Sequence, residues 1–410
     1  MKSKGDLYIM LPCVLTANFE ETNLPVESEF SPNETNDFAK LFKNELFETA
    51  KYEFDNALSK RLKRFILGDI ELVCKSDNRE KPEIIGIQKA FVIITKLIDT
   101  EFCLVIIFIV DINVSLTHLL DQVSRGELKL LENNQETSFV ESELMKKYGI
   151  KPTGKAFFTS CLLNFDKEDK EAKYIIAGEA FNNDENHFIQ SEKINSLLDM
   201  NHKQYSSYDA YMSERGVTII LQESEKNNFY SERLKIECLT IFIMELVILK
   251  ITAINAANNE IIESFSEKDE SKINIQKINE QFSTALPLWD IRHFRYILAQ
   301  EFANRVETAF NVTRFINEYE KNRKFLEQLI NNKKMIISEN EETVIRRFAI
   351  VLSILQAIPF LTKIIISILA KTIDVLQILA LFASSTITLT VIFLLFRKSK
   401  IQKSNQALLS

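Results

Sequence analysis

The sequence predicts an α+β protein with an N-terminal cytoplasmic α/β domain, a long helical stalk and a C-terminal two-helix transmembrane hairpin. Three observations predict this order. Strand-like and helix-like segments are mixed in the first two-thirds of the chain. No glycine follows Gly216, which favours long helices from there on. Between Phe348 and Phe396 the charged residues are Lys363, Lys371 and Asp374, and about 20 apolar residues suffice for a helix to cross a bilayer.

These observations divide the chain into four parts. The predicted parts are the α/β domain at 1–225, the stalk helices at 226–347, the hairpin at 348–396 with spans at 348–370 and 373–396, and a basic tail at 397–410. Lys and Arg flank both spans, and short basic flanks stay in the cytoplasm. The sequence therefore predicts a multi-pass protein of the inner (plasma) membrane with both termini in the cytoplasm.

Within the first part, β-branched and aromatic residues indicate strands. Residues 84–98 and 102–112 are rich in Ile, Val and Phe, the composition of buried strands. The stretch LYIMLPCVL near the start and residues 215–222 predict further strands. Residues 37–67 repeat apolar side chains at helical spacing and predict a helix.

The stalk begins with a long apolar segment, residues 232–265, that predicts one helix. Glu245 and Lys250 lie in the middle of its apolar run. A charge in the middle of a membrane costs roughly 2.5–3.5 kcal/mol, so we expect a buried helix rather than a third span. A charged helix is predicted to follow Pro287 and to continue toward the first span.

Residues that usually carry catalysis or metals form no recognisable pattern. The five cysteines have no CxxC spacing, which favours a reducing compartment and no disulfide framework. The four histidines lack HExxH spacing, so no metal ligands are assigned. Residues 149–156, GIKPTGKA, resemble a phosphate-binding loop, but Ala156 replaces the magnesium-binding hydroxyl and a strand-like stretch follows. We expect a surface turn there and no enzymatic activity.

Two clusters are candidates for ligand binding. Tyr208, Tyr211 and Arg215 in the stretch YSSYDAYMSER could stack on a base and grip a phosphate, although a loop at a domain edge has the same composition. The basic cluster Arg292, His293 and Arg295 could meet an anion; the alternative is a solvated helix start.

The first predicted span carries a polar stripe on one helical face. A polar stripe on a membrane helix faces a bundle interior or water, which favours a pore lining. The alternative is hydrogen bonding between helices, with Lys363 reaching the interface. The predicted pore-lining residues are Ser353, Gln356, Phe360, Lys363, Ser367 and Lys371.

The order LWDIRHFRY, a charged helix, RRFAIVLSILQAIPFLT, a short turn and a second span ending in FRKSK resembles the CorA family of magnesium and cobalt transporters over about residues 205–403. The resemblance implies a homopentamer in the lipid bilayer whose first span lines the pore, with no direct nucleic-acid partner. The family's Gly-Met-Asn motif is absent: Ser367, Ile368, Leu369 and Ala370 stand in its place.

CorA-like proteins without that motif resemble the membrane effectors of type III CRISPR antiviral defence. This resemblance implies a channel opened by an adenylate-derived second messenger, such as a conjugate of S-adenosylmethionine and AMP. The alternatives are a divalent-cation transporter that handles Mg²⁺ or Co²⁺ through an atypical filter and a membrane-anchored scaffold. No cofactor is assigned beyond an adenylate nucleotide or Mg²⁺ as candidate ligands.

Overall fold

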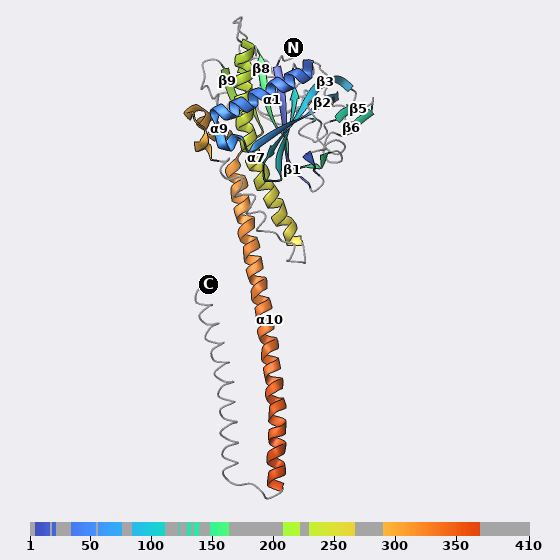
Figure 1. Ribbon diagram of the computed structural model, residues 1–410, viewed down its shortest axis with the longest axis vertical. Coiled ribbons are helices and arrows are strands. Elements are labelled where there is room, and N and C mark those ends of the chain that lie inside the picture. Colours follow the sequence, from blue (N-terminus) through green and yellow to red (C-terminus); the bar gives the residue numbers. More distant parts are fainter. Residues whose placement is uncertain are drawn as a thin grey trace, which may run out of the picture. The chain divides into compact units, whose positions relative to one another are not determined.

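The computed structural model describes residues 5–16, 19–21, 34–54, 56–75, 84–110, 122, 129–132, 135–138, 148–163, 208–221, 229–266 and 290–369. The chain divides into two compact units, Met1–Leu326 and Glu327–Ser410. The first unit is built on one mixed sheet with helices packed against it (Figure 1).

The described strands form a 10-stranded sheet in the order β6-β5-β2-β3-β4-β1-β8-β10-β9, with β7 paired to β1. The β8–β10 pair is parallel and the other pairs are antiparallel. The strands are β1 (Gly5–Leu15), β2 (Leu62–Lys75), β3 (Ile84–Leu97), β4 (Phe102–Ile109), β5 (Lys129–Glu132), β6 (Gln135–Ser138), β7 (Ile150–Pro152), β8 (Phe157–Leu163), β9 (Tyr208–Met212) and β10 (Gly216–Leu221).

The central strands β1 and β4 are buried on both faces. Alternate residues of β1 point to opposite sides of the sheet. Tyr8 and Met10 belong to one hydrophobic cluster, while Leu7 and Ile9 belong to the other. This double burial explains why β1 and β4 read as nearly continuous apolar runs in the sequence.

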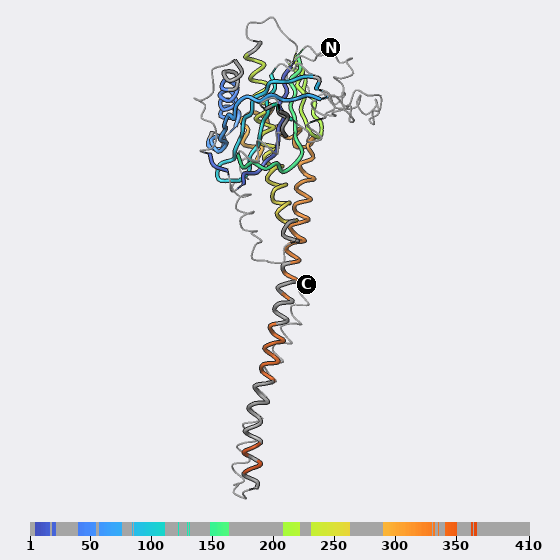
Figure 2. Tube along the Cα trace, turned by 90° about the vertical axis from the view of Figure 1, so that its right-hand side faces the viewer, coloured from blue at the N-terminus to red at the C-terminus, as the bar shows by residue number. Residues whose placement is uncertain are grey.

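The helices of the first unit cover the face of the sheet that carries Tyr8. Phe42 of α1 stacks on the Tyr8 ring with centroids 5.5 Å apart, and Phe108 of β4 stacks on it at 4.1 Å. Figure 2 shows α1 beside the strands from a second direction. The helical elements are α1 (Glu34–Glu53), α2 (Asn56–Ser59), α7 (Phe229–Ser266), the 3-10 helix η6 (Ile291–His293), α9 (Ile297–Ala309) and α10 (Val312–Leu369).

Helix α7 carries a charge into the core, where a matched charge meets it. The carboxylate of Glu245 is fully buried and accepts hydrogen bonds from Arg64 Nε at 3.2 Å and Nη2 at 2.5 Å. Thr95 Oγ1 donates to the same carboxylate at 2.5 Å. Burying an unpaired carboxylate is costly, so these contacts fix how α7 lies on β2 and β3.

A second buried network holds the beginning of α7 to β1. Tyr8 donates its hydroxyl hydrogen to Glu237 Oε2 at 2.5 Å, and Arg233 Nε donates to Glu237 Oε1 at 2.7 Å. Arg233 also pairs with Asp6. Burial, followed by the charge of Glu237, raises the pKa of Tyr8 well above its ordinary value, so its hydroxyl stays a donor.

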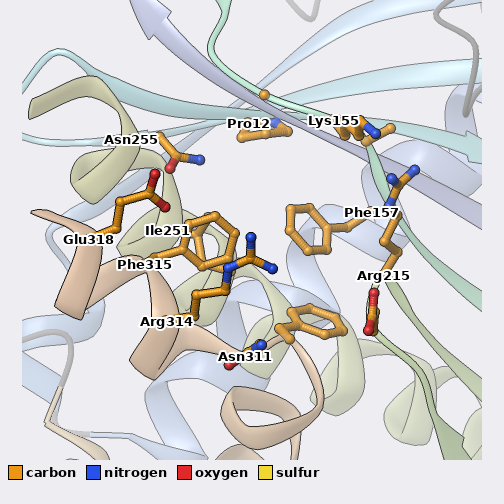
Figure 3. A pocket seen from close by; sticks show the side chains of 14 residues that line it. Pro12, Lys155, Phe157, Arg215, Ile251, Asn255, Asn311, Arg314, Phe315 and Glu318 are labelled. Carbon is orange, nitrogen blue, oxygen red and sulfur yellow. The ribbon is translucent and has the colours of Figure 1, made fainter. Parts of the chain in front are cut away.

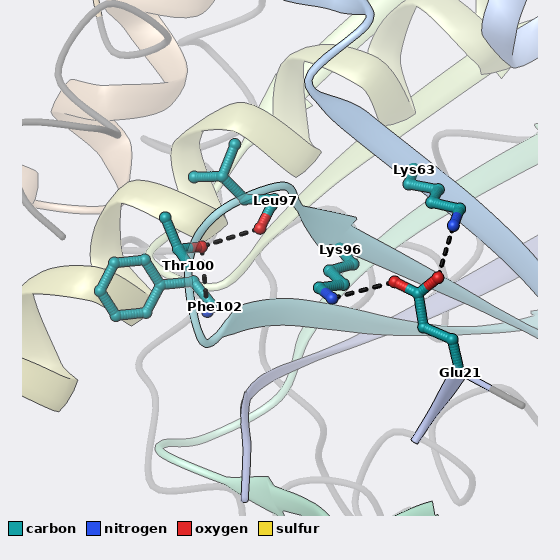
Figure 4. A network of polar contacts seen from close by, with 6 residues as sticks. All are labelled: Glu21, Lys63, Lys96, Leu97, Thr100 and Phe102. Atoms are coloured by element: carbon teal, nitrogen blue, oxygen red, sulfur yellow. Dashed lines mark hydrogen bonds and ion pairs between the residues drawn. The ribbon is translucent and has the colours of Figure 1, made fainter. Parts of the chain in front are cut away.

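A surface network joins β2 and β3 close to the turn that leads from β3 to β4 (Figure 4). Lys63 and Lys96 lie directly opposite each other in the β2–β3 register, and like charges in this position repel. Glu21 lies between them, with its carboxylate 2.5 Å from Lys63 Nζ and 3.0 Å from Lys96 Nζ. These two hydrogen bonds lower the pKa of Glu21. In the β3–β4 turn, Thr100 Oγ1 donates to Leu97 O at 2.9 Å.

Several sequence-based predictions of elements are confirmed. The strands predicted near the start, at 84–98, at 102–112 and at 215–222 are β1, β3, β4 and β10. The helix predicted at 232–265 is α7, and Glu245 in its apolar run is buried. The helix predicted at 37–67 is wrong in its last part, because Leu62 begins β2. From Leu62 onward, successive side chains point to opposite faces of the sheet, as in a strand.

The predicted fold class, with its transmembrane hairpin, and the predicted multi-pass membrane location are both wrong. No helix among the described residues has both the length and the apolar run that crossing a membrane requires. Helix α10 contains the first predicted span, but it begins far upstream at Val312, and charged side chains such as Lys363 lie along it. The second predicted span, 373–396, and the basic tail lie outside the described residues.

The buried Arg64–Glu245 ion pair predicts that substitutions at two neighbouring residues of β2 lower the free energy of unfolding by very different amounts. We expect Arg64→Met to lower the free energy of unfolding by about 3–5 kcal/mol, because it leaves the Glu245 carboxylate buried without its charge partner. Lys63→Met removes a half-exposed surface pair and is expected to cost at most about 1 kcal/mol. Urea denaturation of both variants measures the difference.

The double variant Arg64→Met/Glu245→Leu is the matched control. It removes both charges, so its loss of stability should be smaller than that of Arg64→Met alone. If the double variant loses as much stability as the single variants Arg64→Met and Glu245→Leu lose together, Arg64 and Glu245 do not stabilise the fold as a coupled pair.

Candidate ligand-binding pocket

A cavity of about 390 Å³ opens in the first unit at one end of the sheet, a volume in the usual range for small-molecule sites. Its walls come from β1, from the turns before β8 and before β10, from the middle of α7 and from the start of α10 (Figure 3). Segments far apart in the sequence therefore meet here.

Three basic side chains line the cavity: Lys155, Arg215 and Arg314. Lys155 and Arg314 are exposed, and Arg215 is half-buried. Among the described residues, none of the three side chains takes part in a hydrogen bond or an ion pair. In Figure 3 the guanidinium of Arg314 projects into the space between Phe315 and Phe157. The cavity is therefore lined by positive charges that form no ion pair within the described part of the chain.

Backbone hydrogen bonds of two turns position Lys155 and Arg215. The Thr153 N–H and hydroxyl both donate to Pro12 O, at 2.9 and 3.2 Å, which holds the turn with Lys155 on β1. In the β9–β10 turn, the Ser213 N–H donates to Gly216 O at 2.9 Å. A Cβ at Gly216 would lie 2.4 Å from the Phe158 ring, so glycine is required beside Arg215.

Aromatic rings form the apolar wall of the cavity. Phe157 and Phe310 are buried, with ring centroids 4.8 Å apart and planes inclined by 33°. Phe315, on the first turn of α10, is half-buried, and Ile251 of α7 fills the floor. Flat ring faces next to unpaired cations suit a ligand that has both a planar ring and an anionic group.

Carboxylates and amides complete the lining. Glu214 and Glu318 are exposed at the cavity, and Asn255 and Asn311 lie among them. Three cations against two carboxylates give the lining a formal charge of 3 − 2 = +1. The cavity therefore combines anion attraction with hydrogen-bond donors and acceptors.

Among the residues that the structure describes, no cluster of side chains is suited to bind a metal ion. No group of three His, Cys, Asp or Glu side chains there is arranged to hold a metal ion. The five cysteines are free and buried, and burial raises the pKa of Cys74 to about 12.

No protein-family model, curated protein or solved structure matches this chain. The resemblance to CorA proteins therefore stays a prediction from sequence order.

The structure separates the first cluster predicted to bind a ligand. Arg215 lines the cavity. Tyr208 and Tyr211 are 7% and 2% exposed on β9, so they are buried in the fold rather than available for stacking. The turn predicted at GIKPTGKA is correct only for the second half of that stretch: its first half contains β7 (Ile150–Pro152), and the turn between β7 and β8 carries Lys155 into the cavity.

The second predicted cluster lies at η6 and is not part of the cavity. The guanidinium of Arg292 pairs with Asp290 through contacts of 2.6 to 3.1 Å. His293 packs at 6.0 Å from the Phe54 ring, edge to face. The Arg295 N–H donates to Glu53 O at 2.8 Å, which joins this segment to the end of α1. The Asp290 carboxylate thus already pairs with Arg292, which was predicted to bind an anion.

The residues predicted to line a pore lie on or beyond α10. Ser353, Gln356, Phe360 and Ser367 fall within the helix, and their side chains are outside the described part of the structure. Lys363 is exposed. Lys371 lies outside the described residues altogether.

Sequence reasoning missed Arg314 and the aromatic residues around it. Arg314 and Phe315 follow a helix-breaking position, Asn311, in a segment that was read as one continuous helix. The Phe157 ring was read only as part of a strand. No local spacing connects these positions, since the fold brings them together from different elements.

The Asp290–Arg292 contact predicts a measurable titration. Hydrogen bonds from the Arg292 side chain and then its backbone lower the pKa of Asp290 to about 2. Because this folded-state pKa is depressed, the contribution of Asp290 to stability is present above its unfolded value of about 3.9 and is lost as the pH falls toward 2. NMR titration of the carboxyl carbon measures the value directly.

Arg292→Gln tests the stated cause. In this variant the pKa of Asp290 should rise toward its ordinary value, whereas Arg295→Gln should leave it low. An Asp290 carboxyl that titrates near 4 in the unmodified chain would contradict the contact.

Proposed function

We propose that this chain is a small-molecule sensor whose pocket binds an adenylate-type nucleotide. The observation that carries the proposal is the set of three basic side chains without described counter-ions, Lys155, Arg215 and Arg314, beside a wall of phenylalanine rings. The ligand class is the one that the sequence resemblance implies.

The basic side chains supply the sites for phosphate. Arginine binds phosphate oxygens through a planar fork of N–H donors, and lysine adds a point charge. Arg215 and Arg314 come from opposite walls of the cavity, one from the sheet and the other from α10 (Figure 3). A phosphate between them would meet donors from both sides.

The ring wall supplies the site for a base. Stacking of a base on an aromatic side chain contributes roughly 1–3 kcal/mol. Phe315 is half-buried and therefore has an accessible surface, while the buried rings of Phe157 and Phe310 also line the cavity. Asn255 and Asn311 carry both donors and acceptors, which can pair with the edge of an adenine.

The carboxylates of Glu214 and Glu318 favour a ligand with hydroxyl or amino groups as well as phosphate. Ribose hydroxyls and the adenine amino group are donors of this kind. Inorganic phosphate alone would leave both carboxylates and the rings without a partner.

The pore and the cation-transport alternative are not part of the proposal. Both need a helix that crosses a membrane, and none of the helices that the structure describes has the length and apolar run for it. The sensor proposal depends only on residues of the first unit.

Isothermal titration calorimetry with AMP and ATP tests the proposal. Arg314→Gln and Arg215→Gln are each expected to weaken binding at least about tenfold, because a charge-assisted hydrogen bond contributes roughly 1.5–3 kcal/mol. Lys321→Gln is the matched control: Lys321 lies on the same helix, is exposed and does not line the cavity.

Two further titrations separate the parts of the ligand. Adenosine lacks the phosphate and inorganic phosphate lacks the base, so each should bind more weakly than AMP. Equal binding by all variants, or no heat with AMP and ATP, would refute the proposed function.

A further inference from the structure

We propose that the occupant of this pocket holds the first two turns of α10 against the core, so that binding makes the opening of these turns rarer. The inference rests on the proposed function and names the regulation of the same site. It is carried by the position of the pocket across the junction of α9 and α10.

The junction is a short elbow of two residues with opposite roles. Phe310 is 2% exposed and anchors the elbow against Phe157. Asn311 is exposed and has φ +54°, in the left-handed region that ends a helix. The Arg314 N–H donates to Asn311 O at 2.9 Å, so the next helix begins at once. The direction of α10 is therefore set at one residue that lines the pocket.

Beyond the elbow, one side of α10 packs on the core of the first unit. Val312, Tyr319 and Leu326 are buried, and Phe315 and Ile316 are partly buried against the core. The Asn322 side chain donates to Asn258 Oδ1 of α7 at 2.6 Å. Opening of these turns breaks such contacts, and a ligand that also contacts the helix raises the free-energy cost of opening.

The pocket offers a further attachment for α10 when a ligand fills it. Arg314 and Glu318 of α10 line the same cavity as Lys155, Arg215 and Glu214 of the sheet. A bound phosphate that accepts hydrogen bonds from both Arg314 and Arg215 links the helix to the sheet. The ligand then binds the docked state more tightly than the undocked state, which shifts the population toward docking.

Helix α7 provides an internal reference, because it also lines the pocket but is held to the sheet without a ligand. Helix α7 also lines the pocket, through Ile251 and Asn255, but buried ion pairs already hold it to the sheet. We therefore expect the ligand to change the opening of α10 and to leave α7 unchanged.

Hydrogen–deuterium exchange of the full chain, with and without saturating ATP, tests the inference. Exchange of amides in 312–326 should slow at least about fivefold on ATP binding, the lower end of usual couplings between sites. Amides of α7 in 240–250 should not change. Arg314→Gln should abolish the slowing, and the control Lys321→Gln should keep it.

Calorimetry on the same samples separates this inference from the proposed function. If ATP binds and exchange in 312–326 does not change, the control of α10 is refuted and the sensor function stands. If ATP does not bind, the proposed function fails, and this inference fails with it.

Discussion

Burial of α7 against the sheet is the constraint on which the rest of the first unit depends. The helix has 38 residues, and its middle is apolar on nearly every side. Within that middle, Glu245 is fully buried, so its charge must be matched by Arg64 and Thr95. Apolar burial drives α7 to pack on the sheet but would allow the helix to slide along it. The buried ion pair allows only one position of α7 along the sheet. The network of Glu237 fixes the beginning of the same helix.

The register of α7 in turn places the pocket. Ile251 follows Glu245 by six residues, about 9 Å along the helix, and Asn255 follows one turn later. Lys250, directly before Ile251, pairs with Glu307 of α9 at 2.8 Å, which positions the elbow that begins α10. One buried helix therefore sets the distance between the sheet-borne cations and the cation on α10. Packing of the core determines where the pocket lies, and the charged side chains that would bind a ligand are not part of that core.

Much of the fold was predictable because the main strands and α7 have local signals. The nearly continuous apolar runs of β1 and β4, and the run AFVII within β3, reflect burial on both faces. Residues 62–67 were predicted as helix because an alternating strand pattern and a helical pattern overlap in a short stretch. The transmembrane hairpin was predicted wrongly from apolar composition. Of the pocket, only Arg215 was predicted, because its partners Lys155 and Arg314 are 60 and 99 residues away and no sequence spacing connects them.

Photoaffinity labelling with 8-azido-ATP, followed by peptide mapping, tests the central claim most directly because it locates the bound base. The account predicts adducts on peptides that contain Phe157 or Phe310–Phe315, and competition by unmodified ATP. It also predicts loss of these adducts in Arg314→Gln. Labelling confined to peptides that do not line the pocket, or labelling that ATP does not reduce, would contradict the account.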